Sequence, residues 1–300
     1  MLHVLTHNIL PVFAMLALGF ALGRTGQVRH DEAGALNRVA FLVLQPALLL
    51  PLIAGQDWSS FRPAPIAAYA GSQVVMFALA YLVARKGFGR DHLESWLLAM
   101  ATMFVNTLLY IWPISYLIYG EAAALPITAV VSWDSAVTFS FFIVTTDLMA
   151  GRSASRRAAL ARVARNPVLI AIALGAALNL AGLSLPAPVL TAMDFAGAGA
   201  APLTLFALGV ILSGHALLPS GPVIAISALK LLAFPALVWA GLHLTDTPTG
   251  WETLFILAAA GPSGAMAFAL AMLYGVRTDV IAPVIIWTST LSLLSLAWLA

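Results

Sequence analysis

Two short segments rich in helix-breaking and polar residues interrupt long apolar stretches of the sequence. One is Asn106-Thr107, with Pro113 seven residues after the asparagine, and the other is Gly261-Pro262-Ser263-Gly264. Proline removes a backbone donor and glycine releases the chain from helical angles, so freed backbone groups can face a polar cavity. Amides at the start of a helix bind anions, aided by the helix dipole. These segments predict an anion site, with a simple proline kink as the alternative for each one.

Two charged residues stand well inside apolar stretches. They are Asp134, in Ser132-Trp133-Asp134-Ser135, and Lys230. A charge at the centre of a bilayer costs about 2.5–3.5 kcal/mol on insertion scales, so each residue should face a cavity, lose its charge or have a partner. For Asp134 we expect proton coupling or a counter-charge to a ligand, and the alternative is a protonated or helix-capping acid. For Lys230 the alternative to a counter-charge is a side chain that extends to the membrane surface.

Motifs for enzymatic chemistry are missing from the sequence. Cysteine is absent, which excludes thiolate metal sites and cysteine nucleophiles. The six histidines are expected to be loop or interface residues rather than metal ligands. There is no phosphate-binding loop, nucleophile elbow or paired-carboxylate motif. The sequence therefore predicts neither an enzyme nor a metal or cofactor site.

The elements that must position these residues are membrane helices. Of the 300 residues, 62% are hydrophobic and 9% are charged, against roughly 45–50% and about 25% in soluble proteins. A helix needs about 20 apolar residues to cross a bilayer, and ten runs of this kind are present. They are approximately 5–23, 39–55, 63–84, 95–119, 122–150, 168–185, 195–213, 222–244, 253–274 and 280–299. The predicted fold is an all-α integral membrane protein of ten transmembrane helices, and the first run is a retained helix rather than a signal peptide.

The basic residues are distributed unevenly between the gaps. Twelve of the fourteen lie in alternate gaps, whereas Arg62 stands alone on the other side and Lys230 lies inside a run. Basic residues in the gaps between apolar runs are typical of multi-pass membrane proteins, in which they set the orientation. They do not indicate a nucleic-acid partner. The positive-inside rule puts the basic gaps in the cytoplasm and both termini on the outer side of the membrane, which is the periplasmic side if the membrane is a bacterial inner membrane.

The two halves of the chain resemble each other. Residues 17–22, Ala-Leu-Gly-Phe-Ala-Leu, match 173–178 at an offset of 156, and Pro46 falls on Pro202 at the same offset. Each half contains five runs, an odd number, so the second half is expected to be inverted. We therefore predict a five-helix repeat at 1–150, a basic cytoplasmic connector at 151–166 and a second five-helix repeat at 167–300. Inverted repeats place substrate near the bilayer midplane, in interrupted helices.

The chain also resembles the bacterial branch of the auxin efflux carrier family over nearly its whole length. The motifs are Leu10-Pro11-Val12-Phe13, Gly34-Ala35-Leu36-Asn37-Arg38, Gln45-Pro46-Ala47-Leu48-Leu49, Arg165-Asn166-Pro167-Val168, Ala200-Ala201-Pro202-Leu203-Thr204 and Gly261-Pro262-Ser263. The resemblance implies two inverted five-helix repeats whose broken fourth and ninth helices cross at the substrate site. It also implies a scaffold of spans one, two, six and seven and a moving, elevator-type domain of the other six. Relatives include malonate, malate and auxin carriers.

The fourth span departs from the family pattern. The family has Asn-Thr-Gly-Phe and a second glycine before the proline, whereas this chain has Leu108-Leu109-Tyr110-Ile111-Trp112 after Asn106-Thr107. In this span, only Asn106, Thr107 and Pro113 therefore match the family pattern. The added aromatic residues predict a bulkier, more aromatic pocket, and Tyr110 joins the expected substrate residues.

The function expected from these observations is secondary transport of a small organic anion, a carboxylate. It would be driven by an ion gradient or by the membrane potential, without a cofactor. The expected partners are that anion and the lipid bilayer, and a homodimer is left open. The substrate residues would be Asn106, Thr107, Tyr110, Pro113, Gly261, Pro262, Ser263 and Gly264, with Asp134 and Lys230 for coupling or counter-charge. The alternatives are a sodium-coupled symporter of the bile-acid type and a membrane sensor that does not transport.

Overall fold

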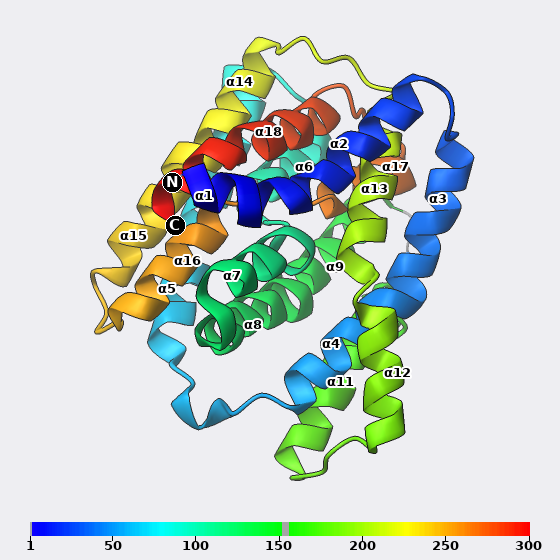
Figure 1. Cartoon of the computed structure of the whole chain (residues 1–300). Helices are drawn as coiled ribbons and strands as arrows, with labels where there is room; N and C mark the ends of the chain where they lie inside the picture. Colours follow the sequence, from blue (N-terminus) through cyan, green and yellow to red (C-terminus); the bar gives the residue numbers. More distant parts are fainter. Residues whose placement is uncertain (1, 152–155) are drawn as a thin grey trace.

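A computed structural model describes the backbone of residues 2–151 and 156–300 and their side chains except those of 156–159. Of the predicted basic connector, Arg152 and the side chains of Arg156 and Arg157 lie outside the described residues. The described chain is helical throughout (Figure 1), and its only β-type pairing is an isolated bridge between Val105 and Ser263. This agrees with the predicted all-α class.

The helices follow one another with short connections. The first half contains α1 (Leu2–Val4), α2 (Leu10–Arg24), α3 (His30–Val39), α4 (Gln45–Ala54), α5 (Pro63–Leu82), α6 (His92–Met103), α7 (Trp112–Tyr119), α8 (Ala124–Trp133) and α9 (Ser140–Met149). The second contains α10 (Arg156–Ala164), α11 (Pro167–Leu180), α12 (Ala187–Gly197), α13 (Ala200–Leu212), α14 (Gly221–Ala228), α15 (Phe234–Leu242), α16 (Thr249–Ala260), α17 (Met266–Tyr274) and α18 (Ile281–Leu299). Short π-helical turns at 5–9, 40–44, 83–87, 107–111, 134–139 and 229–233 extend or join them.

Among the described residues, seven continuous helical segments are long and apolar enough to cross a membrane. They are Leu2–Arg24, His30–Ala54, Pro63–Gly87, Thr107–Met149, Ala187–Leu212, Gly221–Leu242 and Ile281–Leu299. Membrane-spanning helices are thus present, while the predicted number of ten is not established by length and composition. Seven segments are found instead of ten because three of the predicted runs do not form a long helix of their own. One is short, one is divided and one is fused to its neighbour.

The fused segment, Thr107–Met149, has 43 residues. At 1.5 Å per residue its length would be about twice the hydrocarbon thickness of a bilayer. Gly120 divides it, because its φ of 60° ends α7 and the chain turns back so that α7 lies beside α8 (Figure 1). The divided run at 253–274 consists of α16 and α17, and the short run corresponds to α11, which has 14 residues.

The second helical segment begins nine residues before the predicted boundary at 39. Arg29 precedes α3, and the Glu32 carboxylate accepts a hydrogen bond from the Arg29 backbone N–H at 2.9 Å. This backbone-to-carboxylate bond at the helix start stabilises the first turn of a helix in a polar stretch that hydropathy alone excludes. The helix therefore extends beyond its apolar part.

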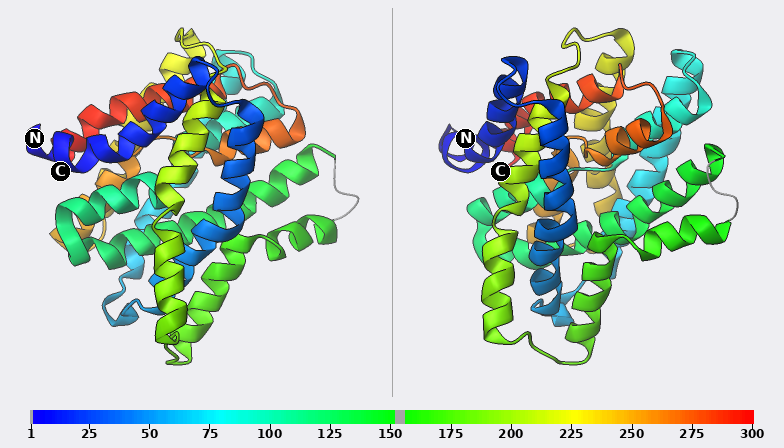
Figure 2. Two further views of the ribbon diagram at one scale, coloured as in Figure 1. Left: turned by 45° about the vertical axis from the view of Figure 1, so that its right-hand side comes forward. Right: turned by 90° about the vertical axis from the view of Figure 1, so that its right-hand side faces the viewer.

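The helices form two groups. Helices α2, α3, α4, α11, α12 and α13 contact one another extensively, and α5, α6, α8 and α14–α18 form the second group. In both views of Figure 2 the blue α3 and α4 run beside the yellow-green α12 and α13. Glycines bring α2 and α13 together, since a Cβ at Gly209 would lie 2.1 Å from the carbonyl oxygen of Leu16. Small residues at such contacts allow the backbones of membrane helices to approach closely.

Candidate functional site

The two polar segments interrupt their helices and pair with each other. Helix α6 ends at Met103 and α16 ends at Ala260. Between the following half-helices, the Asn106 N–H donates to the Pro262 carbonyl at 3.0 Å and the Gly264 N–H donates to the Phe104 carbonyl at 2.8 Å. Backbone groups that no helix satisfies are thus satisfied across the molecule, as buried backbone requires.

Glycine is needed where these segments touch. A Cβ at Gly264 would lie 2.6 Å from the Cδ1 atom of Phe104, and one at Gly261 would lie 2.5 Å from the Cδ1 atom of Ile111. Distances below about 3 Å are never tolerated without movement of the neighbour. The Gly-Pro-Ser-Gly sequence therefore serves close approach as well as helix breaking.

Pro113 does not cause the first interruption. It lies seven residues into the helical segment that begins at Thr107, and the helix is already broken before that segment, at 104–106. Tyr110 is fully buried in the core rather than exposed to a pocket. Trp112 stacks on Tyr116 with ring centroids 5.4 Å apart.

A cavity of about 510 Å³ reaches the paired segments from between the two helix groups. One wall contains Asn106, Thr107, Asp134, Ser135 and Gly264, and the facing wall contains Asn37, Gln45, Asn166 and Thr204. Its aromatic lining comes from Phe41, Phe104, Phe139 and Tyr274. Tyr110 and Trp112, on which the prediction of a more aromatic pocket rested, do not line this cavity.

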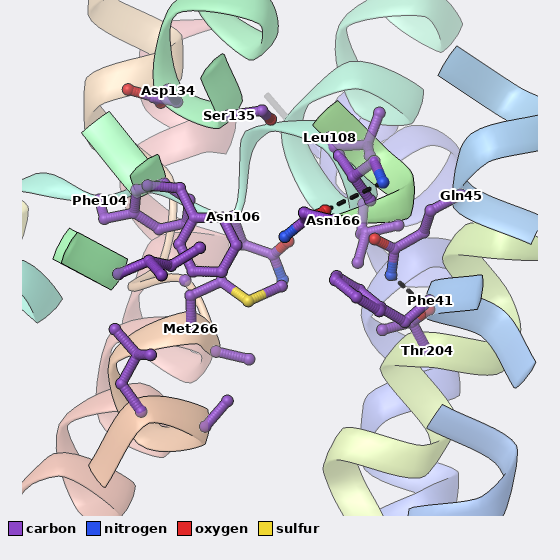
Figure 3. Close-up of a pocket in the computed structure, with 18 of the residues that line it drawn as sticks. Phe41, Gln45, Phe104, Asn106, Leu108, Asp134, Ser135, Asn166, Thr204 and Met266 are labelled. Carbon is purple, nitrogen blue, oxygen red and sulfur yellow. Dashed lines mark hydrogen bonds between the residues drawn. The ribbon is translucent and has the colours of Figure 1, made fainter. Parts of the chain in front are cut away.

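The facing wall is built by helices distant in sequence. The Gln45 Nε2 atom donates to the Thr204 hydroxyl at 3.4 Å, and both side chains are buried. Figure 3 shows this pair opposite Asn106, with Asn166 between them. The Asn166 Oδ1 atom caps α11 by accepting from the Val168 and Leu169 N–H groups, which leaves its amide nitrogen available to the cavity.

Positive charge lies where the cavity reaches the surface. Arg38, Arg162 and Arg165 line the cavity and are exposed. Arg162 also binds the buried carboxylate of Asp147, which accepts a hydrogen bond from the Tyr274 hydroxyl at 2.9 Å. Asp147 thereby links α9, α10 and α17.

Asp134 faces the interior of the protein, as predicted, with 2% of its surface exposed. Its carboxylate accepts hydrogen bonds from the Gln73 amide at 2.7 Å and from the Tyr69 and Thr107 hydroxyls at 3.2 Å each. The Trp133 indole N–H donates to Gln73 Oε1 at 2.8 Å, which fixes the orientation of that amide. Three donors thus compensate the burial of the carboxylate.

Lys230 lies apart from the cavity. Its side chain is fully buried and does not line the cavity wall, and its Nζ atom donates to the Ala259 carbonyl at 2.6 Å. It therefore neither extends to the membrane surface nor faces a ligand in the cavity. Of the predicted residues, Asn106, Thr107, Gly264 and Asp134 line the cavity, whereas Tyr110, Pro113, Gly261, Pro262, Ser263 and Lys230 do not.

Sequence reasoning missed the facing wall and the exposed arginines. Gln45 carried a signal, because it is a polar residue inside an apolar run. Asn166 and Thr204 were recognised only as parts of family motifs. Arg38, Arg162 and Arg165 were assigned to orientation alone, and their position at the cavity depends on how the helices pack.

Comparisons with known proteins identify relatives over nearly the whole chain. The chain is 26% identical to a protein of Rhizobium meliloti named "Putative malonate transporter", over 96% of this chain and 92% of that protein. It is 27% identical to a protein of Methanothermobacter thermautotrophicus named "Uncharacterized transporter", over 97% of this chain and 96% of that one. Residues 4–299 match a family described as membrane transport protein. With helices apolar enough to span a bilayer and a family match over nearly its whole length, the chain belongs to the membrane transport protein family, as a multi-pass membrane transporter.

Proposed function

We propose that this transporter carries a small organic anion, a carboxylate such as malonate, through the cavity at the paired helix interruptions. The observation that carries the proposal is that two helices begin at this cavity. Thr107, Leu108 and Leu109 line it at the start of one, and Gly264, Ala265 and Met266 line it at the start of the other. The first N–H groups of a helix lack partners within it and carry the positive end of its dipole.

The chemistry around these helix starts suits an anion that must be released again. The Tyr110 and Ile111 N–H groups donate to the Asn106 carbonyl, whereas the N–H groups of residues 107–109 precede the first bonds of this helix and are the ones left for a ligand, together with the Asn106 side-chain amide. No arginine lies at the interruptions, so binding relies on neutral donors. Neutral donors hold a carboxylate less tightly than a bidentate guanidinium does. The name of the Rhizobium meliloti relative supports malonate as the first substrate to test.

We propose a ten-span arrangement of two inverted five-helix repeats in an inner membrane, with both termini outside. Helix α18 ends beside the N-terminal segment (Figure 1), which supports termini on one side. The α2–α4 and α11–α13 group would be the scaffold, and the other group would move in an elevator-type cycle. The membrane potential would provide about 2.3 kcal/mol per elementary charge per 100 mV.

Asp134 is the proposed coupling residue. It lines the cavity and accepts a hydrogen bond from Thr107, the first residue of the resumed helix. A proton on the Asp134 Oδ2 atom would turn the oxygen that accepts from Thr107 into a donor and change the hydrogen bonds next to the substrate. Occupancy of the two sites would then be linked.

The test is uptake of labelled malonate into proteoliposomes that contain the purified protein, with and without a pH gradient, a sodium gradient and a membrane potential. We expect saturable uptake that unlabelled small carboxylates compete with and that sodium does not affect. Sodium-dependent uptake would favour the bile-acid type of symporter. Specific binding of malonate without any uptake would favour a sensor, and no binding of any small carboxylate would reject the proposed substrate class.

A further inference from the structure

The ends of the two interrupted helices are related by the internal repeat. Helices α6 and α16 have 12 residues each and lie 157 residues apart, from His92 to Thr249 and from Met103 to Ala260. Each ends immediately before the paired segments. The last carbonyls of a helix have no partner within it, and they carry the negative end of the helix dipole. Each end therefore needs donors or a cation inside the membrane.

The same repeat supplies a donor to each end. The Gln73 Nε2 atom donates to the Met103 carbonyl at 3.2 Å, and the Lys230 Nζ atom donates to the Ala259 carbonyl at 2.6 Å. Gln73 and Lys230 are themselves 157 residues apart. The two halves thus have a similar contact at the end of the corresponding helix, displaced by one residue, but one uses a neutral amide and the other an ammonium group.

The groups that surround the Lys230 ammonium are of the kinds that bind a cation. The side chain is fully buried, and its Nζ atom lies 5.0 Å from the centroid of the Phe234 ring. A carbonyl at a helix end and an aromatic face are both cation ligands. The hydrogen bonds described for the buried acid Asp134 are to Tyr69, Gln73 and Thr107, and none joins it to Lys230 in the described part of the chain. The charge of Lys230 therefore interacts with the carbonyl end of α16.

We propose that the Lys230 ammonium is a tethered cation that takes the place of a monovalent cation at the C-terminal end of α16. Ends of interrupted helices are where carriers hold coupling ions. A carrier with a lysine in that position cannot take up and release sodium there. The identification of the displaced ion as a coupling ion rests on the proposed carrier function. The need of the helix end for a cation does not depend on that function.

The experiment is chemical rescue, followed by thermal unfolding of the purified full-length protein without substrate. In Lys230→Ala the lost ammonium leaves a space and an unsatisfied carbonyl, and we expect the unfolding midpoint to fall by roughly 3–10 °C. Methylammonium, which restores the ammonium head group, should recover most of this loss, and sodium a part of it. N-methylglucamine is too large for the space and should recover none. Lys86→Ala is the matched control, because Lys86 is the other lysine of the chain and is exposed.

Two further variants separate charge from hydrogen bonding. Lys230→Gln copies the Gln73 arrangement, and Lys230→Met keeps the length without any donor. We expect both to have lower midpoints than the parent and neither to respond to methylammonium, because their side chains occupy the space. If Lys230→Ala does not fold unless methylammonium is added during purification, the inference is supported.

An unfolding midpoint of Lys230→Gln equal to that of the parent would overturn the inference, because a charge would then be unnecessary. A folded Lys230→Ala that responds equally to methylammonium and N-methylglucamine would overturn it as well. These outcomes do not depend on transport. A protein that shows rescue but no uptake of carboxylates would contradict the proposed function alone, and uptake without rescue would contradict only the role of Lys230.

Discussion

At the scale of single residues, Asn106 is where the helix interruption meets the cavity. Its backbone pairs with Pro262, and its side chain lines the cavity. We predict that Asn106→Ala weakens carboxylate binding by about 1.5–3 kcal/mol, the usual range for a hydrogen bond to a charged group. Isothermal titration with malonate measures this. Asn8→Ala is the control, since Asn8 bonds to Leu117 outside the cavity. Equal binding of neutral amide analogues would reject this assignment.

Asp134 is the residue on which pH dependence should rest. We predict that Asp134→Asn leaves substrate binding largely intact and removes the pH dependence of transport, because asparagine resembles the protonated acid at every pH. Initial uptake rates across a pH series measure this effect. Retained pH dependence in the variant would reduce Asp134 to a structural residue.

Asp57 offers a control acid outside the membrane-spanning segments. The Ser59 backbone N–H donates to its carboxylate at 2.9 Å, and this hydrogen bond holds the pKa of Asp57 below its usual value. The carboxylate therefore stays charged above that lowered pKa and protonates only in more acidic solution. Asp57→Asn should accordingly leave the pH profile of transport unchanged near neutrality.

At the scale of elements, the contact between the two interrupted helices depends on Gly264. We predict that Gly264→Ala destabilises the protein by about 1–3 kcal/mol, the usual cost of overpacking, because its Cβ would meet the Phe104 ring. Thermal unfolding in detergent measures the loss, and uptake should fall with it. The matched control is Gly71→Ala, in the exposed part of α5, where a Cβ has open space. Equal stability of the two variants would show that the contact yields without cost.

At the scale of the whole molecule, the uneven distribution of charge has two consequences. The first concerns the cavity opening, where exposed Arg38 and Arg165 should attract anions. We predict that replacing both by glutamine raises the KM for a carboxylate entering from that side by roughly 2- to 10-fold at low salt. High salt should abolish the difference, because exposed charges are then screened. Uptake at two ionic strengths measures it, with Arg62→Gln as the control.

The second consequence is orientation. Twelve of fourteen basic residues lie in alternate gaps, and we predict that these gaps are cytoplasmic and that both termini are outside. Fusions of a phosphatase and a fluorescent reporter at the two termini and after Arg165 measure the side of each site. A cytoplasmic terminus, or a periplasmic site after Arg165, would contradict this orientation and the proposed span number.

Features that depend on local composition could be predicted from the sequence. Hydropathy indicates membrane helices wherever apolar residues run on for about 20 positions. Gly261-Pro262 predicts an interruption because its backbone cannot continue a helix. The burial of Asp134 follows from the cost of a charge in lipid. Each of these inferences needs only neighbouring residues and the nature of the bilayer.

Only the tertiary structure decided which side chains share the cavity. Gln45 and Thr204 meet across 159 positions of sequence, and Tyr110 and Lys230 lie in the core although their types suggested a ligand. The helices are apolar on nearly all faces, so no periodic pattern tells which face is turned to the cavity and which to lipid. Rotation and register are set by close contacts such as Gly209 against Leu16. These contacts join residues far apart in the chain, and local composition carries no information about them.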